Sequence, residues 1–260
     1  MGVTEQNVDK LRVCIFQTRK ELGVYAAAEA ASAMRQLLRT QEQVNLIFAA
    51  APSQTEFLEA LCAEPDIDWS RVNAFHMDEY VGLAIGQDGS FTQFLNHAVF
   101  DKLPFKNVYR INGVAPDPAE ECNRYAELLR THPIDAVFMG VGENGHIAFN
   151  DPPVADFQDP VSIKVVTLDE ICRMQQVHDK CFRTFDDVPK QAFTLTVPAL
   201  VSAKKLFCMV PAETKADAVA HMLTDTISEK CPASILRTHV NAVLYLDSDS
   251  AKTYLKHQKS

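Results

Sequence analysis

The chain has 260 residues, with 25 Lys and Arg against 34 Asp and Glu, so its formal net charge is −9 at pH 7. Apolar residues make up 47% of the sequence, which excludes an intrinsically disordered chain, and 9 glycines without a period exclude a collagen-like one. The acidic balance argues against nucleic acid as a partner, because proteins bind a phosphate backbone through clustered Lys and Arg.

Cysteine usage and hydropathy indicate a compartment. The seven cysteines form no CxxC pair, and an odd number without close pairing is typical of reduced, mostly buried thiols. Residues 1–10 are polar, so we expect no signal peptide, and the longest apolar stretches are far too short to cross a bilayer. We therefore expect a cytoplasmic protein without membrane contact.

Strand-like and helix-like segments alternate along the chain. After about ten polar residues that we expect to be peripheral, a β-rich run over residues 11–17 predicts a strand. A helical pattern follows, and its apolar face is expected to hold Val24, Ala28, Ala31, Met34 and Leu38. The continuous apolar run over residues 44–50 is typical of a buried parallel strand.

The next segments carry clear start signals. Ser53 and Glu56 have the spacing of a capping box, which predicts a helix from Ser53 with an apolar stripe of Phe57, Leu58, Leu61 and Cys62. Residues 72–77 predict a strand, and a loop with three glycines leads to a helix from about Ser90.

The second half continues the alternation. A short strand over residues 108–111 precedes a helix that Asp117 caps, with an inner face of Cys122, Tyr125, Ala126 and Leu129. Further strands are predicted over residues 134–139, 162–168, 192–197, 205–210 and 242–246. Residues 169–181 have a helical pattern, Thr214 and Asp217 predict another capped helix, and the C-terminal tail is polar.

This alternation predicts an α/β fold. Strands that alternate with helices form parallel βαβ units, so we expect a Rossmann-like three-layer sandwich with an open, mostly parallel sheet. No linker, composition shift or repeat divides the sequence, which predicts a single domain over residues 1–260.

Four unusual segments each follow directly on a predicted strand. They are residues 51–55, 78–83, 140–153 and 211–215. Ligands of open parallel sheets bind at the carboxyl ends of the strands, so we expect these segments to converge on one site. The alternative is that they are ordinary polar loops.

Asp78 and Glu79 follow the strand over residues 72–77. Neighbouring side chains point in different directions there, so we expect one carboxylate to face a ligand, where it can act as a general base. A surface turn is the simpler interpretation. His76 and Asp78 are alternate strand residues without further ligands nearby, so we expect no metal site.

Two helix starts are candidate anion sites. Unpaired N–H groups at the start of the helix from Ser53 bind phosphate readily, although Ser53 is equally explained as a cap. Lys215 stands in the first turn of another helix, against the macrodipole preference, and a ligand anion held there would explain it.

The glycine-rich segment over residues 140–153 matches G-x-G-x-x-G. A dinucleotide site needs a helix to begin at these glycines, but the sequence continues to an Asp-Pro-Pro that cannot open one. His146, between Asn144 and Asp151 and beside a flexible backbone at Gly142 and Gly145, suits proton transfer instead.

At these residues the sequence resembles the glucosamine-6-phosphate deaminase/isomerase family, whose superfamily also holds 6-phosphogluconolactonases. Residues 75–83 (FHMDEYVGL) are similar to its F-x-M-D-E-Y-x-G-L signature, and residues 140–152 (GVGENGHIAFNDP) to its G-x-G-x-D-G-H-I-A-F-N-E-P signature. The similarity runs over about residues 11–247, and lactonases lack both the D-E-Y-x-G-L and the A-F-N pattern.

The resemblance implies a reaction without cofactor or metal. An amino-sugar phosphate is ring-opened, a proton moves between C2 and C1, and ammonia is released. By position, Asp78 is the C2 base and His146 the ring-opening acid/base, with Asn144 and Asp151 beside it in catalytic positions. Substrate-binding positions are Ser53, Gln54, Glu79, Gly142, Gly145, Arg173 and Lys215.

The chain departs from the family pattern at four places. Asn144 replaces an Asp, Asp151 replaces a Glu, and the family's T-G-x-T phosphate loop is residues 51–54, without its glycine. The family's arginine segment is also rewritten, and Arg173, His178 or Lys180 are the candidates to replace its contact.

These departures keep two alternatives open: a lactonase-like hydrolase in which His146 activates water, and a sugar-phosphate-binding protein with weakened catalysis. A homo-oligomer is an expectation from the resemblance alone. The polar stretch over residues 154–190 suggests a mobile lid.

Overall fold

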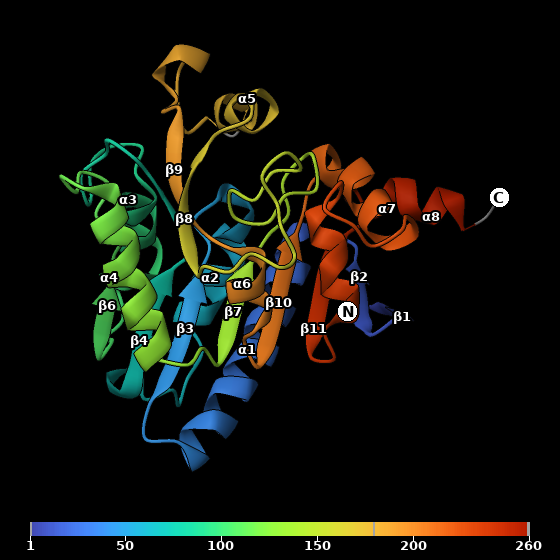
Figure 1. The fold of residues 1–260 in the computed structure, drawn as a ribbon. Coiled ribbons are helices and arrows are strands. Elements are labelled where there is room, and N and C mark those ends of the chain that lie inside the picture. Colours follow the sequence, from blue (N-terminus) through green and yellow to red (C-terminus); the bar gives the residue numbers. More distant parts are fainter. Residues whose placement is uncertain (1, 179, 259–260) are drawn as a thin grey trace.

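The computed structural model describes residues 2–178 and 180–258, which form a large sheet with helices on both faces and a small sheet at one end (Figure 1). The strands of the large sheet, in spatial order, are β1 (Thr4–Val8), β2 (Leu11–Phe16), β11 (Ala242–Asp247), β10 (Lys205–Val210), β7 (Ala136–Met139), β3 (Val44–Phe48), β4 (Val72–His76) and β6 (Asn107–Tyr109). Every pairing is parallel except that of β1 with β2. The predicted α/β fold with a mostly parallel sheet is confirmed.

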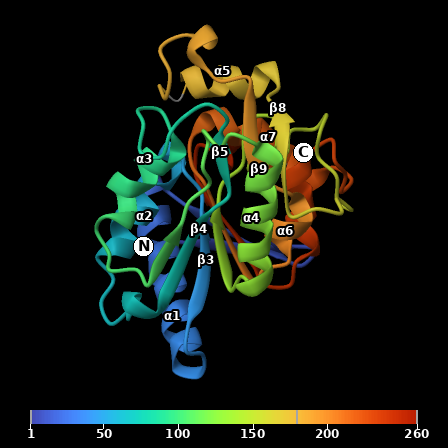
Figure 2. The ribbon, with the colours of Figure 1, turned by 60° about the vertical axis from the view of Figure 1, so that its left-hand side comes forward.

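Helices cover both faces of this sheet, as the turned view shows (Figure 2). The helices are α1 (Arg19–Thr40), α2 (Thr55–Cys62), α3 (Phe91–Leu95), α4 (Pro118–Thr131), α5 (Glu170–His178), α6 (Val197–Val201), α7 (Ala216–Thr224) and α8 (Lys252–His257). The side chains of β3 alternate between two cores: Val44, Leu46 and Phe48 pack with α1 and α2, while Ile47 packs with α4 and α7 on the other face.

Three short strands form a second, antiparallel sheet at the carboxyl end of the large one. They are β5 (Asp78–Tyr80), β9 (Gln191–Leu195) and β8 (Ile163–Thr167), with β9 in the middle. Helix α5 lies beyond this sheet, at the top of Figure 1. The predicted βαβ alternation did not include such a sheet. Its antiparallel pairing of Asp78 with Thr194 joins segments far apart in the sequence, which local periodicity does not reveal.

Two features near the N-terminus were not predicted. Residues 4–8 form β1 at the edge of the large sheet, and the exposed and polar side chains of this strand give no apolar signal. On α1, Val24 is 39% exposed and Ala28 is exposed, whereas Ala31, Met34 and Leu38 are buried as predicted. The buried face also holds Leu22, Ala26, Ala27 and Ala30. An alanine-rich helix gives little hydrophobic contrast from which to read its phase.

Two predicted helix caps were also wrong. Ser53 lies inside a 3₁₀ turn, η1 (Pro52–Gln54), and its side chain caps neither this turn nor α2. Glu56, the other residue of the predicted capping box, pairs with Arg19 instead. Thr214 lies in a similar turn, η5 (Glu213–Lys215), and α7 begins after it without a side-chain cap. Caps at Ser90 and Asp117 are confirmed, since both side chains accept a backbone N–H of the helix they precede.

The C-terminal segment is not only a polar tail, because α8 packs on α7 through Tyr254, which is 4% exposed. Within the described part of the chain, every helix is too short or too polar to cross a membrane.

Candidate active site

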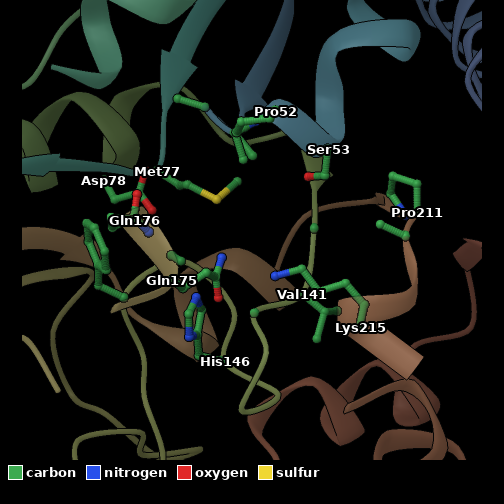
Figure 3. A pocket seen from close by; sticks show the side chains of 18 of the residues that line it. Pro52, Ser53, Met77, Asp78, Val141, His146, Gln175, Gln176, Pro211 and Lys215 are labelled. Carbon is green, nitrogen blue, oxygen red and sulfur yellow. The ribbon is translucent and has the colours of Figure 1, made fainter. Parts of the chain in front are cut away.

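The four predicted loop segments converge at one edge of the large sheet. Strands β10, β7, β3 and β4 are direct neighbours, and each is followed by one of these segments. The chain order reverses between β3 and β7, which is the switch point where open α/β sheets bind ligands. A pocket lies there, lined by Ser53, Asp78, Gly142, His146 and Lys215 among others (Figure 3).

Asp78 begins β5 and places its carboxylate in the pocket (Figure 3). The side chain is 7% exposed. Burial raises the pKa of Asp78 well above its ordinary value, and the neighbouring charge of Glu79 raises it further. A carboxylate that binds protons more tightly than usual is well suited to take a proton from carbon.

His76 fixes the backbone of Asp78 from behind. Its ring is fully buried, with Nδ1 2.8 Å from the Asp78 carbonyl oxygen, and Nε2 accepts the Ile111 N–H at 2.8 Å. These partners require a neutral ring that carries its proton on Nδ1. Burial agrees, because it lowers the pKa of His76 to about 4. His76 therefore holds the junction between the two sheets as a hydrogen-bonding group.

His146 faces the pocket from the loop after β7, with Asn144 and Asp151 behind it. Its Nδ1 lies 2.8 Å from Asn144 Oδ1 and 2.9 Å from Asp151 Oδ1. Asn144 Nδ2 donates to the same Asp151 oxygen at 2.8 Å. With the Nδ1 proton directed at these oxygens, Nε2 is the nitrogen that can exchange a proton with a substrate.

Asp151 supplies the negative charge beside His146 that Asn144 lacks. Burial acts to raise the pKa of Asp151, but the hydrogen bonds and charge of His146 and the bond from Asn144 outweigh it, so the pKa is lowered. The Asp151 carboxylate is therefore ionised and lies directly beside the imidazole ring. The shorter side chain of Asp still reaches Nδ1.

The ligand atoms of His146, Asp151 and Cys172 lie within 4.8 Å of one another, and all three residues are buried. Among the described residues, this is the group of His, Asp and Cys side chains whose spacing would allow them to hold a metal ion. Nδ1 and the Asp151 carboxylate already bind each other, so a cation would have to break that hydrogen bond. The arrangement thus fits an oriented histidine better than a metal ligand set.

The two predicted glycine positions serve different purposes. A Cβ on Gly142 would lie 2.1 Å from His146 Cε1, so only glycine lets the imidazole lie against this backbone. Gly145 has φ +84° and faces Cys231 Sγ, which would be 2.7 Å from an added Cβ, behind the loop. Gly142 therefore lines the pocket and Gly145 shapes the turn that carries His146.

The opposite end of the pocket is cationic. Lys215 is 6% exposed at the end of η5, and Ser53 lies across from it in η1 (Figure 3). Thr214 and Arg19 line the same end. Proton-transfer groups at one end and hydroxyls with two cations at the other suit a small molecule that carries an anionic group.

Three further residues expected to bind substrate have other partners. Glu79 accepts the N–H groups of Tyr80, Phe91 and Thr92, and thereby fixes the start of α3. Gln54 Nε2 donates to Ser53 Oγ and to the carbonyls of Met139 and Met209. Arg173 donates to the carbonyls of Phe185 and Val188, and its guanidinium lies 3.9 Å from the Phe185 ring centre.

We therefore no longer expect Glu79, Gln54 or Arg173 to contact substrate directly. The alternatives to Arg173 lie elsewhere as well, since His178 approaches Glu143 at 3.6 Å and Lys180 lines a neighbouring pocket. Gln175 and Gln176 of α5 enter the pocket beside Asp78 and His146 (Figure 3). Neither glutamine was predicted, because only the cationic side chains of the rewritten segment were considered as replacements for the arginine.

Comparisons with known proteins show which family the chain resembles. A family model described as glucosamine-6-phosphate isomerases/6-phosphogluconolactonase matches residues 17–245. A protein of Listeria welshimeri named glucosamine-6-phosphate deaminase is 34% identical over 212 residues, which are 82% of this chain and 88% of that protein. One of Bacillus cereus with the same name is 34% identical over 241 residues, covering 92% of this chain and 88% of that protein.

Solved structures show the same pattern. One described as a monomeric glucosamine-6-phosphate deaminase is similar with a TM-score of 0.85 and 28% identity, covering 93% of this chain and 99% of that one. A 6-phosphogluconolactonase of Thermotoga maritima has a TM-score of 0.73 at 18% identity, covering 90% of this chain and 98% of that one. The latter likeness shows the shared fold.

Proposed function

The chain belongs to the family of glucosamine-6-phosphate isomerases and 6-phosphogluconolactonases, and we propose that it converts glucosamine 6-phosphate, or a close amino-sugar phosphate, to fructose 6-phosphate and ammonia. The observation that carries the proposal is the placement of Asp78 and His146 in one pocket whose far end is cationic. The relatives named deaminases support the same reaction.

His146 opens the sugar ring in the first step. Its Nε2 takes the proton of the C1 hydroxyl and returns one to the ring oxygen, which yields the open-chain aldehyde. The imidazole carries a positive charge between these two transfers. Asp151 stabilises that charge through Nδ1 at 2.9 Å, and Asn144 fixes both partners by hydrogen bonds.

Asp78 moves the proton in the second step. Its carboxylate removes the C2 proton and delivers it to C1, while O1 gains a proton and the amino group loses one, which converts the 2-amino aldehyde into a 2-imino alcohol. Water then adds to this imine, and ammonia leaves with formation of the C2 ketone. Burial raises the pKa of Asp78, so its carboxylate holds a proton more tightly than an ordinary aspartate, which favours the abstraction from carbon.

Hydrolysis of a lactone is the alternative reaction for a protein of this fold. Similar structures named 6-phosphogluconolactonases are 15–18% identical, which supports only a common fold. Hydrolysis of a lactone needs His146 to activate water and gives Asp78 no carbon acid to deprotonate. The substitution Asp78→Asn therefore separates the two reactions.

The test is the release of ammonia and fructose 6-phosphate from glucosamine 6-phosphate by the wild type, by Asp78→Asn and by Asp217→Asn. Asp217 is a matched control, because its carboxylate accepts a hydrogen bond from Thr253 Oγ1 and does not line the pocket that holds Asp78. We expect turnover in the wild type and the control and none in Asp78→Asn. Hydrolysis of 6-phosphogluconolactone by both variants, without ammonia release by the wild type, would refute the proposal.

A further inference from the structure

The backbone turn that faces the cationic end of the pocket has few N–H groups to offer an anion. Residues 51–54 contain no glycine, and Pro52 has no N–H at all. The N–H of Gln54 donates to the Ala51 carbonyl at 2.9 Å, inside the 3₁₀ turn η1. This turn therefore offers an anion fewer backbone donors than its four residues suggest, and side chains that line the same end can supply others.

Arg19 brings a guanidinium to this turn from the first residue of α1. Its Nε donates to Glu56 Oε1 at 2.5 Å, and its Nη2 donates to Glu56 Oε2 at 2.8 Å and to the Pro52 carbonyl at 2.9 Å. No described residue accepts a hydrogen bond from Nη1. The side chain is 41% exposed and lines the pocket with Ser53, Thr214 and Lys215.

We infer that Arg19 is a phosphate-binding residue of this chain, with a guanidinium in place of the backbone amides that the turn does not supply. Three fixed hydrogen bonds aim the planar group, so little side-chain entropy is lost when phosphate binds. Arg19 lines this end of the pocket together with Lys215, so two cationic side chains border the place where a phosphate group would lie.

The inference rests on the proposed function and deepens it, because it names what makes the substrate a phosphosugar. It predicts that Arg19 acts on binding and not on proton transfer. Asp78 and His146 stand at the other end of the pocket (Figure 3), so loss of Arg19 raises KM and leaves kcat within a few-fold of the wild-type value.

A purely structural role for Arg19 is the competing explanation, and the chain contains a control for it. Arg35, further along α1, donates to Glu64 Oε2 at 3.3 Å and to the Pro65 carbonyl at 2.7 Å. Arg35 thus links α1 to the segment after α2, and Arg19 links α1 to the start of α2. Each arginine does so through one glutamate carboxylate and one proline carbonyl. Arg35 does not line the pocket.

The experiment compares the wild type, Arg19→Met and Arg35→Met, because Met keeps the alkyl chain and removes the charge. Binding is read as the rise in melting temperature with inorganic phosphate and with fructose 6-phosphate. Kinetics are measured with glucosamine 6-phosphate and with unphosphorylated glucosamine. A double variant, Arg19→Met/Glu56→Gln, replaces Arg19→Met if the unpaired Glu56 prevents folding.

We expect Arg19→Met to weaken binding of both phosphate ligands about 10- to 100-fold, the loss typical of one charged hydrogen-bond donor. KM for glucosamine 6-phosphate should rise by the same factor, while kcat/KM for glucosamine should stay unchanged. Arg35→Met should bind phosphate as the wild type does. Equal phosphate binding by the two variants, or no binding by the wild type, overturns the inference.

The outcome also separates this inference from the proposed function. Deamination by the wild type with an unchanged KM in Arg19→Met leaves the function standing and removes the role of Arg19. Phosphate binding that is lost only in Arg19→Met, without any deamination by the wild type, leaves the role of Arg19 and removes the function.

Discussion

The pair of Asn144 and Asp151 behind His146 allows a reciprocal test of how the imidazole is charged. Asp151 Oδ1 accepts hydrogen bonds from both His146 Nδ1 and Asn144 Nδ2. In Asp151→Asn, an amide oxygen at the same place keeps both acceptor positions and loses the negative charge. A charged hydrogen bond contributes about 1.5–3 kcal/mol, so kcat/KM should fall about 10- to 150-fold.

The converse substitution is also expected to be harmful. Asn144→Asp would place a second carboxylate where Asn144 Nδ2 now lies 2.8 Å from Asp151 Oδ1. Two carboxylates at that distance do not both ionise, so the site gains no charge, and the amide hydrogen bond from Asn144 to Asp151 is lost. We expect about a tenfold loss of kcat/KM, within the usual range for one broken hydrogen bond.

The double variant Asn144→Asp/Asp151→Asn restores one carboxylate and one amide with their places exchanged. Because Nδ1 lies 2.8 Å from the first position and 2.9 Å from the second, the charge is again beside the imidazole. We expect the double variant to be more active than Asp151→Asn, measured as kcat/KM with glucosamine 6-phosphate in a double-mutant cycle. If kcat/KM of the double variant falls by the product of the two single-variant factors, this account of the pair is refuted.

Three further predictions concern Asp78, Gly142 and Arg173. The pKa of Asp78 is raised by folding, so ionisation of its carboxylate destabilises the folded state, and Asp78→Asn should unfold at a higher temperature than the wild type. This gain in stability should be absent below the ordinary aspartate pKa and complete above the folded-state pKa. An equal gain in stability at all pH values would contradict the reasoning. Gly142→Ala should lower kcat about 100-fold, since its Cβ would displace the His146 ring, and a folded variant of normal activity would contradict that clash. Arg173→Ala should cost about 1–3 kcal/mol in urea unfolding by leaving the Phe185 and Val188 carbonyls unpaired; a large rise in KM at unchanged stability would show that it binds substrate.

Periodicity alone was sufficient to predict the central parallel strands of the large sheet and the edge at which the site lies. The apolar runs at β3, β7 and β10 are buried on both faces of the sheet, which makes such strands easy to recognise. The order of the strands was not predicted, but the carboxyl-end rule needs no order. It was enough to bring Ser53, Asp78, His146 and Lys215 to one edge.

Long-range pairing explains most of what the sequence did not reveal. Glu56 has the spacing of a capping residue, yet it binds Arg19, 37 positions earlier in the chain. Arg173 and Gln176 stand on one short helix, and only tertiary packing decides that the first turns to Phe185 and the second to the pocket. The local sequence is compatible with either residue facing the pocket, and the charged one, Arg173, was predicted to bind substrate.

Transfer of the C2 proton by Asp78 is the central claim, and hydrogen exchange tests it most directly. Glucosamine 6-phosphate is converted in D₂O, and the fructose 6-phosphate formed is examined by NMR for deuterium at C1. We predict C1 deuterium with the wild type, by exchange of the proton on Asp78 with solvent, and neither deuterium nor ammonia with Asp78→Asn. Ammonia release by Asp78→Asn at the wild-type rate would contradict the claim.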